Sequence, residues 1–382
     1  MKEYNRKIDI IIPAYNVPDD IFFRCLSSIA CQTIIKEAKV TIVDDASTKG
    51  NYQAIANHFK KIMKIDILRL KENGGPGVAR QYGLDHTSNG YVTFVDADDT
   101  LNGPFALRAL REAIERGKHC VCSGVFDEML HEHEDDSEPT IALPHEEDFI
   151  WMFGKLYKRQ FLDKYKIHFH PTSRANEDNG FNTMIKMCAG DGEEEESIIY
   201  IPAHVYCWHE NLNSITRIND CQYTYGSSER DSFYGFVENM IYALKETKDK
   251  TLFYGNIIVW TAYCMVNLYA YYLECYAFAR QHADKNLQYC KRFYNEIYKE
   301  IESEISYELL AEQYKEMIKN IYANNKLNGF IPHITFQDFM DSIKADDRQF
   351  EEVLASLPKE VQDIVNNLQQ EGILCEEVVY ED

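Results

Sequence analysis

The sequence has too few basic residues to bind a polyanion over its whole surface. Its 382 residues include 40 Lys and Arg against 62 Asp and Glu, and the formal net charge is −22. Such a surface repels nucleic acid and anionic lipid. Nucleic acid is therefore not expected as a partner, although a local basic pocket for phosphate groups is compatible with this balance.

Cysteine pairs of the kind that bind zinc or form redox sites are also absent. The 11 cysteines are odd in number and scattered, and no two have the Cys-x-x-Cys spacing. This usage predicts reduced core thiols in a cytoplasmic protein rather than a disulfide framework or a zinc site. Residues 1–9 lead straight into a strand-like run without an apolar signal segment, which favours the same compartment.

The sequence lacks a clear membrane-spanning run. Residues 257–273 are aromatic and largely uncharged, but they are barely numerous enough to cross a bilayer. They contain Thr261 and Asn267, and Glu274 follows directly. We expect a buried helix or a helix at a subunit interface. Homo-oligomer formation and peripheral contact with the inner face of the membrane stay open.

The first half of the sequence alternates between strand-like and helix-like patterns. Short β-prone runs are separated by segments whose apolar residues recur every three or four positions. The predicted strands are residues 8–13, 40–43, 65–70, 91–95, 119–126 and 197–201. The predicted helices are residues 21–29, 52–63, 78–85 and 106–115. This alternation predicts an α/β fold with a mostly parallel sheet between helices.

The length is enough for two domains. Beyond about residue 219 the sequence becomes mostly helical in pattern, tyrosine-rich and acidic. We therefore expect one domain over residues 1–218 and a helical region over 219–382. Residues 128–148 are acidic and contain His131, His133 and His145. We expect a solvated loop there, with a metal site as the alternative.

Polar clusters follow three of the predicted strands, where a parallel sheet binds its ligands. They are Pro13-Ala14-Tyr15-Asn16, Asp44-Asp45-Ala46-Ser47 and Asp96-Ala97-Asp98-Asp99. Three carboxylates at one strand end suit Mg²⁺ or Mn²⁺ carrying a diphosphate, because hard cations prefer oxygen ligands. The alternative is an Asp-capped turn. Tyr15 could stack on a nucleobase, and Asp44 or Asp45 could accept from a base N–H or a ribose hydroxyl, or form an Asx turn.

Two further segments suggest phosphate binding and acid–base chemistry. Residues 73–80 are glycine-rich and open a helix, so the backbone at Gly75 could approach a phosphate, with Arg80 one turn further on. The alternative is an ordinary glycine turn. Glu177 and Asp178 precede an apolar helix face. They could cap that helix, or one of them could act as a general base at the mouth of a cleft.

Taken together, these motifs resemble family 2 glycosyltransferases in their order and spacing. The resemblance rests on residues 10–16, 43–47, 73–80 and 94–99, and continues through 154–157, 176–178 and 208–210 to 213–216. It covers about residues 8–216. It implies a Rossmann-like GT-A fold, a nucleotide-sugar donor that is usually a UDP-sugar, a divalent metal, and inversion at the anomeric carbon.

The resemblance also implies roles for particular residues. Pro13, Tyr15 and Asp45 would hold the uracil, within a nucleotide site that includes Ala14, Asn16, Asp44, Gly75 and Ala97. Arg80 would lie near the base and diphosphate. Asp96 would contact the ribose or donor sugar, and Asp98 would bind Mn²⁺ or Mg²⁺ with Asp96 beside it. Asp178 would be the general base with Glu177 as its neighbour. His209 resembles a late metal or diphosphate ligand, with His204 as the alternative.

The expected function is transfer of a hexose or N-acetylhexosamine from a UDP-sugar to a hydroxyl of a glycan, teichoic-acid or glycoprotein acceptor. A nucleotidyltransferase would need a basic glycine-rich loop after the first strand, where residues 14–18 read Ala-Tyr-Asn-Val-Pro. A non-catalytic sugar-nucleotide binding protein is the other alternative, and the carboxylates at 96, 98 and 178 argue against it. The sequence does not identify the sugar or the acceptor.

Overall fold

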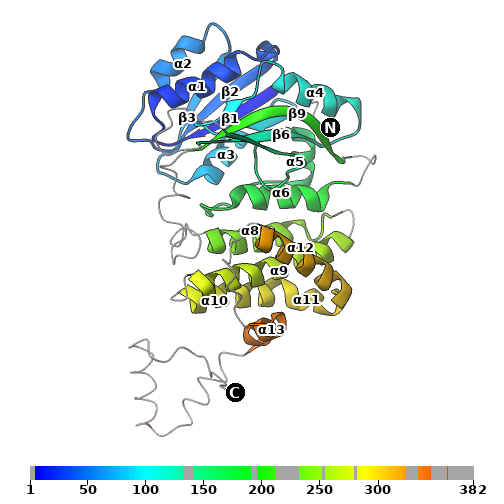
Figure 1. Cartoon of the computed structure of the whole chain (residues 1–382). Coiled ribbons are helices and arrows are strands. Elements are labelled where there is room, and N and C mark those ends of the chain that lie inside the picture. Colours follow the sequence, from blue (N-terminus) through cyan, green and yellow to red (C-terminus); the bar gives the residue numbers. More distant parts are fainter. Residues whose placement is uncertain are drawn as a thin grey trace. The chain divides into compact units, whose positions relative to one another are not determined.

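The fold is built around a nine-stranded sheet (Figure 1). The computed structural model describes residues 5–131, 141–190, 196–210, 232–251, 254–278, 282–323, 334–345 and 359. The sheet has the order β3 (Lys64–Arg69), β2 (Ala38–Asp44), β1 (Ile8–Ala14), β4 (Tyr91–Phe94), β8 (Lys155–Lys158), β6 (Val121–Leu130), β9 (Ile198–His209) and β5 (Thr100–Leu101), with β7 (Ile141–His145) paired to β6.

The half of the sheet formed by β3, β2, β1 and β4 is parallel, as the sequence predicts. The other half is mixed, because β8 runs antiparallel to both β4 and β6, while β6 and β9 are parallel. Strand β1 shows why the parallel half forms. It is an almost continuous apolar run that is buried on both faces, which is typical of parallel strands covered by helices on each side.

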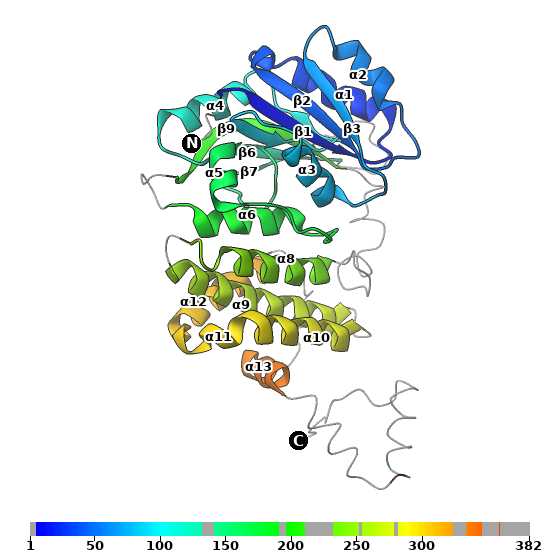
Figure 2. The same cartoon turned by 180° about the vertical axis from the view of Figure 1, so that it is seen from behind.

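Helices cover both faces of the sheet (Figures 1 and 2). Helices α1 (Asp19–Ala30), α2 (Tyr52–Phe59) and α4 (Ala106–Arg116) bury one core cluster with Ile8, Ile10 and Ile12 of β1. Helices α3 (Pro76–Asp85), α5 (Arg159–Tyr165) and α6 (Glu177–Cys188) bury a second cluster with Ile11. Successive β1 side chains therefore belong to different cores, as the alternation of a strand requires.

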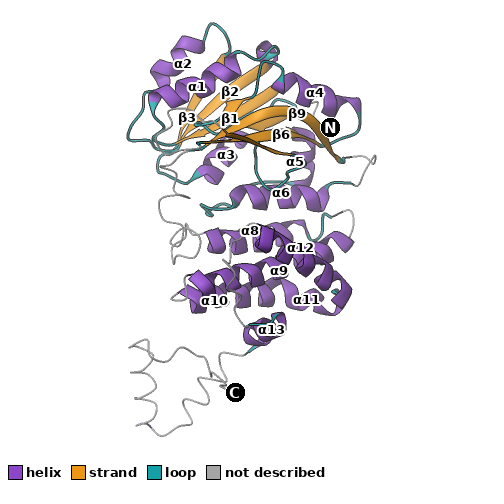
Figure 3. Ribbon diagram, viewed as in Figure 1, coloured by secondary structure: helices purple, strands orange, loops and turns teal. Residues whose placement is uncertain are grey.

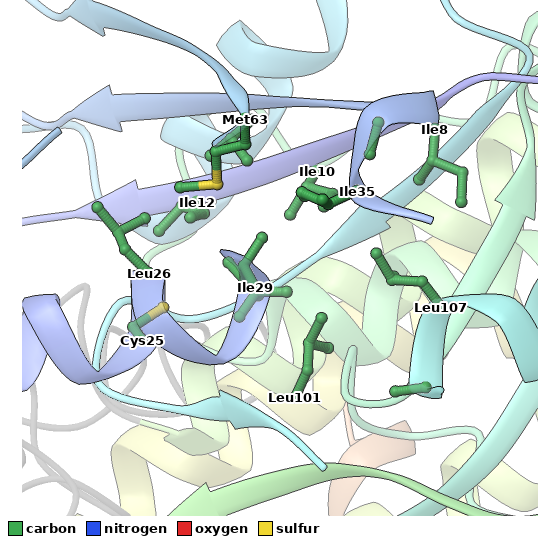
Figure 4. Packing of buried hydrophobic residues seen from close by; sticks show 14 of the residues in the cluster. Ile8, Ile10, Ile12, Cys25, Leu26, Ile29, Ile35, Met63, Leu101 and Leu107 are labelled. Carbon is green, nitrogen blue, oxygen red and sulfur yellow. The ribbon is translucent and has the colours of Figure 1, made fainter. Parts of the chain in front are cut away.

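The first of these cores is shown in Figure 4. Ile10 and Ile12 lie between α1, which contributes Leu26 and Ile29, and the turn that carries Met63. The short 3₁₀ helix η1 (Ile35–Glu37) adds Ile35 to the same cluster. This packing fixes the strands whose carboxyl ends carry the polar clusters.

The elements described after residue 231 are all helices (Figure 3). The elements are α8 (Ser232–Thr247), α9 (Tyr254–Phe278), α10 (Ala283–Phe293), the π-helical turn η3 (Tyr294–Tyr298), α11 (Lys299–Ile301), η4 (Glu302–Glu304) and α12 (Tyr307–Ala323). Helix α8 packs against α6, and residues Met1–Pro332 form one compact unit. Residues His333–Asp382 form a second, in which the Thr335 side chain caps α13 (Phe336–Lys344).

The predicted division near residue 219 stays a prediction, because residues 211–231 lie outside the described part of the chain. The motif at 213–216 and His133 also lie outside it. The expected buried helix over residues 257–273 is part of α9, where Met265 and Leu268 are fully buried. Searching the helices that the structure describes reveals none long and apolar enough to cross a membrane.

Several sequence predictions were wrong in their extent. The strand predicted over residues 197–201 continues to His209 as β9, and the one predicted over 119–126 continues to Leu130 as β6. Residues 141–145 form strand β7 instead of a solvated loop, and His145 stacks on Phe126 of β6 with ring centroids 4.4 Å apart. Pro144 hides this strand in the sequence, because proline is tolerated only on edge strands, where β7 lies. Helix α2 ends at Phe59 rather than at residue 63, because the N–H groups of Ile62 and Met63 both turn back to the Phe59 carbonyl.

Candidate active site

The polar clusters that follow β1, β2 and β4 meet at one edge of the sheet. The three strands are parallel neighbours, and their register pairs Ala14 with Asp44 and Ile11 with Phe94. Residues that follow these strands therefore emerge side by side. The shared edge predicted from the sequence is confirmed.

Tyr15 stands at this edge with 49% of its surface exposed, which is what stacking on a planar base requires. The next residue, Asn16, has a left-handed backbone with φ 54°. Its side-chain oxygen accepts hydrogen bonds from the N–H groups of Thr48 and Lys49, at 2.8 and 2.9 Å. Asn16 therefore ties the loop after β1 to the loop after β2. Pro13 is partly buried at the end of β1.

Asp44 and Asp45 both serve the loops around them. Asp44 accepts from the Ser47 N–H at 2.8 Å and pairs with Arg69. Asp45 accepts from the N–H groups of Gly74 and Gly75, at 2.7 and 2.8 Å. Burial raises the pKa of Asp45, and these two N–H donors partly oppose the rise. The predicted contact of Asp45 with a base stays a prediction.

The glycine-rich loop is held from two sides. The N–H groups of Gly74 and Gly75 point at Asp45, so the structure does not direct them at a phosphate as expected. Gly75 has φ 89°, a conformation that glycine adopts without strain. From the other side of the loop, Arg174 donates to the Asn73 carbonyl at 2.7 Å. The loop is thus a rigid connection to helix α3.

Arg80 joins the third cluster to helix α6. Its guanidinium donates to Asp96 and to Glu177, each at 2.6 Å, and its side chain is only 4% exposed. Burial would lower the pKa of Arg80, but the charges of Asp96 and Glu177 outweigh it and raise the pKa. The expected contact with a base or diphosphate stays a prediction, while in this structure Arg80 bridges two carboxylates. It is a positioning residue between β4 and α6.

Asp178 begins the first turn of α6 beside this bridge. The residue as a whole is partly exposed, and its carboxylate accepts from the Asn179 N–H at 2.8 Å. Burial, followed by the charge of Glu177, raises the pKa of Asp178 to about 7, while Arg80 acts in the opposite direction. A carboxyl with a pKa near the working pH can take up and release a proton, which suits a general base.

The aspartates after β4 divide into one inward and two outward groups. Asp99 is 1% exposed and accepts from the Tyr206 hydroxyl at 2.7 Å and the His209 N–H at 2.9 Å. Burial and the charges of Asp98 and Asp96 raise its pKa well above the usual range. Asp96 and Asp98 are partly exposed, and the side chain of Asp96 is 27% exposed. Asp99 therefore anchors the turn that presents the other two.

The donor set fits a divalent cation whose coordination is completed by a ligand. Among the described residues, no group of three or more His, Cys, Asp or Glu side chains could hold an ion. Mg²⁺ commonly binds one or two carboxylates together with substrate phosphates, and Asp96 and Asp98 provide such carboxylates. Burial lowers the pKa of His209 to about 4, which keeps the imidazole neutral as a metal ligand must be. His204 pairs with Asp127 at 2.8 Å instead.

Both alanines of the predicted nucleotide site have buried side chains. Ala14 and Ala97 belong to the core cluster beneath the edge and are 2% and 3% exposed. Their methyl groups cannot touch a nucleotide, so any contact falls to their backbone. The sequence gives no sign of this, because both alanines lie inside polar clusters.

Sequence reasoning missed the segment that flanks Asp178. Asn182, one turn further along α6, donates to the carbonyls of Ile150 and Trp151 at 3.0 and 2.9 Å and accepts from Tyr157. Trp151 is 46% exposed. Lys155 is fully buried and donates to Asp148 at 3.1 Å. Lys155 lies within residues 154–157, which the resemblance already includes, whereas only its burial shows the importance of Asn182, and a single sequence does not display burial.

Comparison with known proteins agrees with this arrangement. Residues 9–175 match the sequence model of Glycosyl transferase family 2. The chain is 25% identical over 226 residues to the uncharacterized glycosyltransferase EpsJ of Bacillus subtilis, which covers 55% of this chain and 63% of that protein. It is 27% identical over 245 residues to the poly(ribitol-phosphate) beta-glucosyltransferase of Bacillus spizizenii. This match covers 56% of this chain and 38% of that enzyme. The match thus spans less than two thirds of the length of either relative.

The fold is similar to that of S. aureus TarS. The crystal structure of TarS 1-349 in complex with UDP-GlcNAc matches with a TM-score of 0.53 at 17% sequence identity, and the match covers 84% of this chain and 92% of that one. Residues 9–175 therefore form a domain of glycosyltransferase family 2, and the fold is GT-A.

Proposed function

We propose that this chain is an inverting glycosyltransferase that moves a hexose or N-acetylhexosamine from a UDP-sugar to a hydroxyl of a glycan, teichoic-acid or glycoprotein acceptor. The observation that supports this best is the placement of Asp178. Its carboxyl, whose pKa is raised by burial to about 7, lies next to Glu177, which Arg80 links to Asp96 at the end of β4.

The choice of donor rests on relatives. TarS was crystallised with UDP-GlcNAc, and TarS and the Bacillus spizizenii enzyme are named for transfer to poly(ribitol-phosphate). These names favour a UDP-sugar donor and a polyol or glycan hydroxyl as acceptor. The family match also favours sugar transfer over nucleotidyl transfer.

The proposed reaction is a single displacement. The acceptor oxygen attacks the anomeric carbon, the bond from that carbon to the diphosphate oxygen breaks, and UDP leaves with the bonding electrons. The Asp178 carboxylate takes the acceptor proton. Tyr15 stacks on the base, while Asp96 lies toward the ribose or donor sugar. A divalent ion held by Asp98, with Asp96 as a second carboxylate, would supply positive charge to the diphosphate.

The Asp178→Asn variant tests the proposal. We expect transfer to fall by about 10²–10⁴-fold, which is the usual contribution of a general base. UDP binding measured by calorimetry should stay close to that of the unchanged protein. The assay is release of UDP from a panel of UDP-sugars and acceptors, with Mn²⁺ or Mg²⁺ and in parallel with a chelator.

Asp20→Asn provides the matched control, because Asp20 is an exposed carboxyl at the start of α1. It should transfer sugar at the normal rate. Full activity of Asp178→Asn would show that another group is the base. If the unchanged protein releases UDP from none of the donors, the result would favour a binding protein without catalytic activity.

A further inference from the structure

Four lysines line a hollow at the end of the sheet opposite the candidate active site. The hollow has a volume of about 570 Å³ and is lined by Lys36, Lys39, Lys60, Ile62, Met63, Lys64, Ile65 and Asp66. Lys61 is exposed within the same turn. Four lysines and one aspartate in the lining give a formal charge of +3, in a chain whose total is −22.

The turn that presents these lysines is fixed in place. Lys36 donates to the carbonyl of Ile62 at 2.7 Å, and the buried side chain of Met63 anchors the turn in the core (Figure 4). Ile62 itself is 44% exposed. The hollow therefore combines an apolar floor and an exposed aliphatic side chain with a rim of ammonium groups.

Most of this positive charge is available to a ligand. Lys39 pairs with Asp66 at 2.7 Å. Lys60, Lys61 and Lys64 are exposed and form no ion pair with any residue that the structure describes. A fold that needed only solubility would not require three lysines around an exposed isoleucine within five residues.

The position of the hollow separates it from the reaction. Lys39 and Lys64 lie at the amino ends of β2 and β3, whereas Asp44 and Asp45 lie at the carboxyl end of β2. At about 3.3 Å per residue, β2 keeps the two ends roughly 20 Å apart. The hollow can therefore be occupied while the site edge stays open.

We propose that this hollow is a docking site for an anionic lipid surface. Lysine ammonium groups attract phosphate headgroups, and an exposed aliphatic side chain between them can enter the interface. The net charge of −22 would repel the rest of the protein from the same surface. Docking would thus be oriented, with the carboxyl ends of the strands directed away from the lipid.

Sedimentation with vesicles tests this proposal. The probes are phosphatidylcholine vesicles with and without phosphatidylglycerol. We expect the chain to bind only the anionic vesicles, and the triple variant Lys60→Glu/Lys61→Glu/Lys64→Glu to bind them at least about tenfold more weakly. Ile62→Ser should weaken binding by a smaller factor, and added salt should weaken binding of the unchanged protein.

The matched control is Lys166→Glu/Lys299→Glu/Lys315→Glu, which changes the net charge equally at exposed lysines elsewhere. It should bind like the unchanged protein. Equal losses in the two triple variants would overturn the proposal, as would absence of binding to anionic vesicles. Two results together would identify a phosphate polymer as the ligand and would also overturn the lipid proposal. They are that soluble polyphosphate displaces the protein from anionic vesicles and that Ile62→Ser does not change vesicle binding. Donor turnover in free solution should be normal in both triple variants, so this test is independent of the proposed reaction.

Discussion

Asp178 and Asp99 show how position alone gives two aspartates different roles. Asp99 is enclosed and bonded to Tyr206 and the His209 backbone, so it stabilises a turn. Asp178 is partly exposed at the first turn of a helix, and its pKa is raised only to about 7. The proposed role of base therefore falls to Asp178, the residue of the two that is not fully enclosed.

The pKa of Asp178 predicts the pH dependence of transfer. The base acts in its ionised form, so the rate should rise as the pH increases through about 7 and level off above it. The rate of transfer at saturating substrate, measured across this range, checks the prediction. A rate that is flat through neutral pH would show that Asp178 does not limit the reaction.

The raised pKa of Asp178 also predicts that increasing the pH lowers the stability of the folded protein, whereas it increases the rate of transfer. An unfolded aspartate has a pKa of about 3.9, below that of the folded Asp178. The folded chain therefore binds this proton more tightly, and the contribution of Asp178 to stability falls as the pH rises from about 4 to about 7. Asp178→Asn should unfold at a higher urea concentration than the unchanged protein at pH values above about 7. A lower midpoint would contradict the raised pKa.

Arg80→Met should destabilise the protein strongly. It would leave Glu177 buried beside Asp178 without a cation, and breaking a buried ion pair costs about 3–5 kcal/mol. Urea unfolding measures the loss. Since Arg80 lowers the pKa of Asp178, its removal should also shift the rise in transfer rate to higher pH.

An exposed ion pair provides the control for Arg80. Arg108 pairs with Glu112 on the surface of α4, with 53% of its side chain exposed, so Arg108→Met should leave the urea midpoint almost unchanged. The double variant Arg80→Met/Glu177→Gln should recover part of the stability lost in Arg80→Met. Equal losses at Arg80 and Arg108 would mean that the bridge is solvated.

At the scale of elements, helix α8 closes the outer side of α6. Asn239 of α8 is buried and donates to Ser173 and to the carbonyl of Ala175, each at 2.9 Å. Gly235 lies directly against Ala175, and a Cβ there would come within 2.5 Å of the Ala175 carbonyl oxygen. The helix that carries Asp178 is therefore positioned from both sides, by Arg80 and by α8.

Gly235→Ala should loosen this contact. We expect a loss of about 1–3 kcal/mol in the free energy of unfolding, because backbone atoms must move to admit the methyl group. Gly255→Ala is the matched control, since a Cβ at Gly255 in α9 meets nothing within 4 Å. It should be neutral or slightly stabilising. Equal effects of the two substitutions would show that α8 does not press on α6.

The strands of the parallel half could be predicted from the sequence. Helices cover both faces of these strands, so the strands are apolar runs that are easily recognised. The edge strand β7 was not, since Pro144 and its exposed leucine conceal its alternation. Asp96, Asp98 and Asp178 could be found as motif residues. Two other contacts could not be predicted, because they join residues far apart in the sequence. Arg80 pairs with Glu177, which is 97 residues away. Asp45 holds the glycine-rich loop through residues 29 and 30 positions away.

At the scale of the whole molecule, the chain can be divided after Pro332 or near residue 219, and shortened chains distinguish the two boundaries. A chain that ends at Pro332 keeps the compact unit intact and should unfold cooperatively at about the same temperature. A chain that ends at residue 218 would expose Met184 and Met187 of α6, which are now buried, and should lose its cooperative transition. Thermal unfolding followed by circular dichroism compares them. An unchanged transition in the shorter chain would establish the domain boundary near residue 219.

The bridge made by Arg80 also bears on how such a protein can change during evolution. One guanidinium holds both the segment after β4 and the first turn of α6. A substitution that moves either element disturbs the other, so new sugar preferences are expected to arise through side chains outside this link. Mutant libraries that leave positions 80, 96 and 177 unchanged should therefore contain more active variants with altered substrates than libraries that include them.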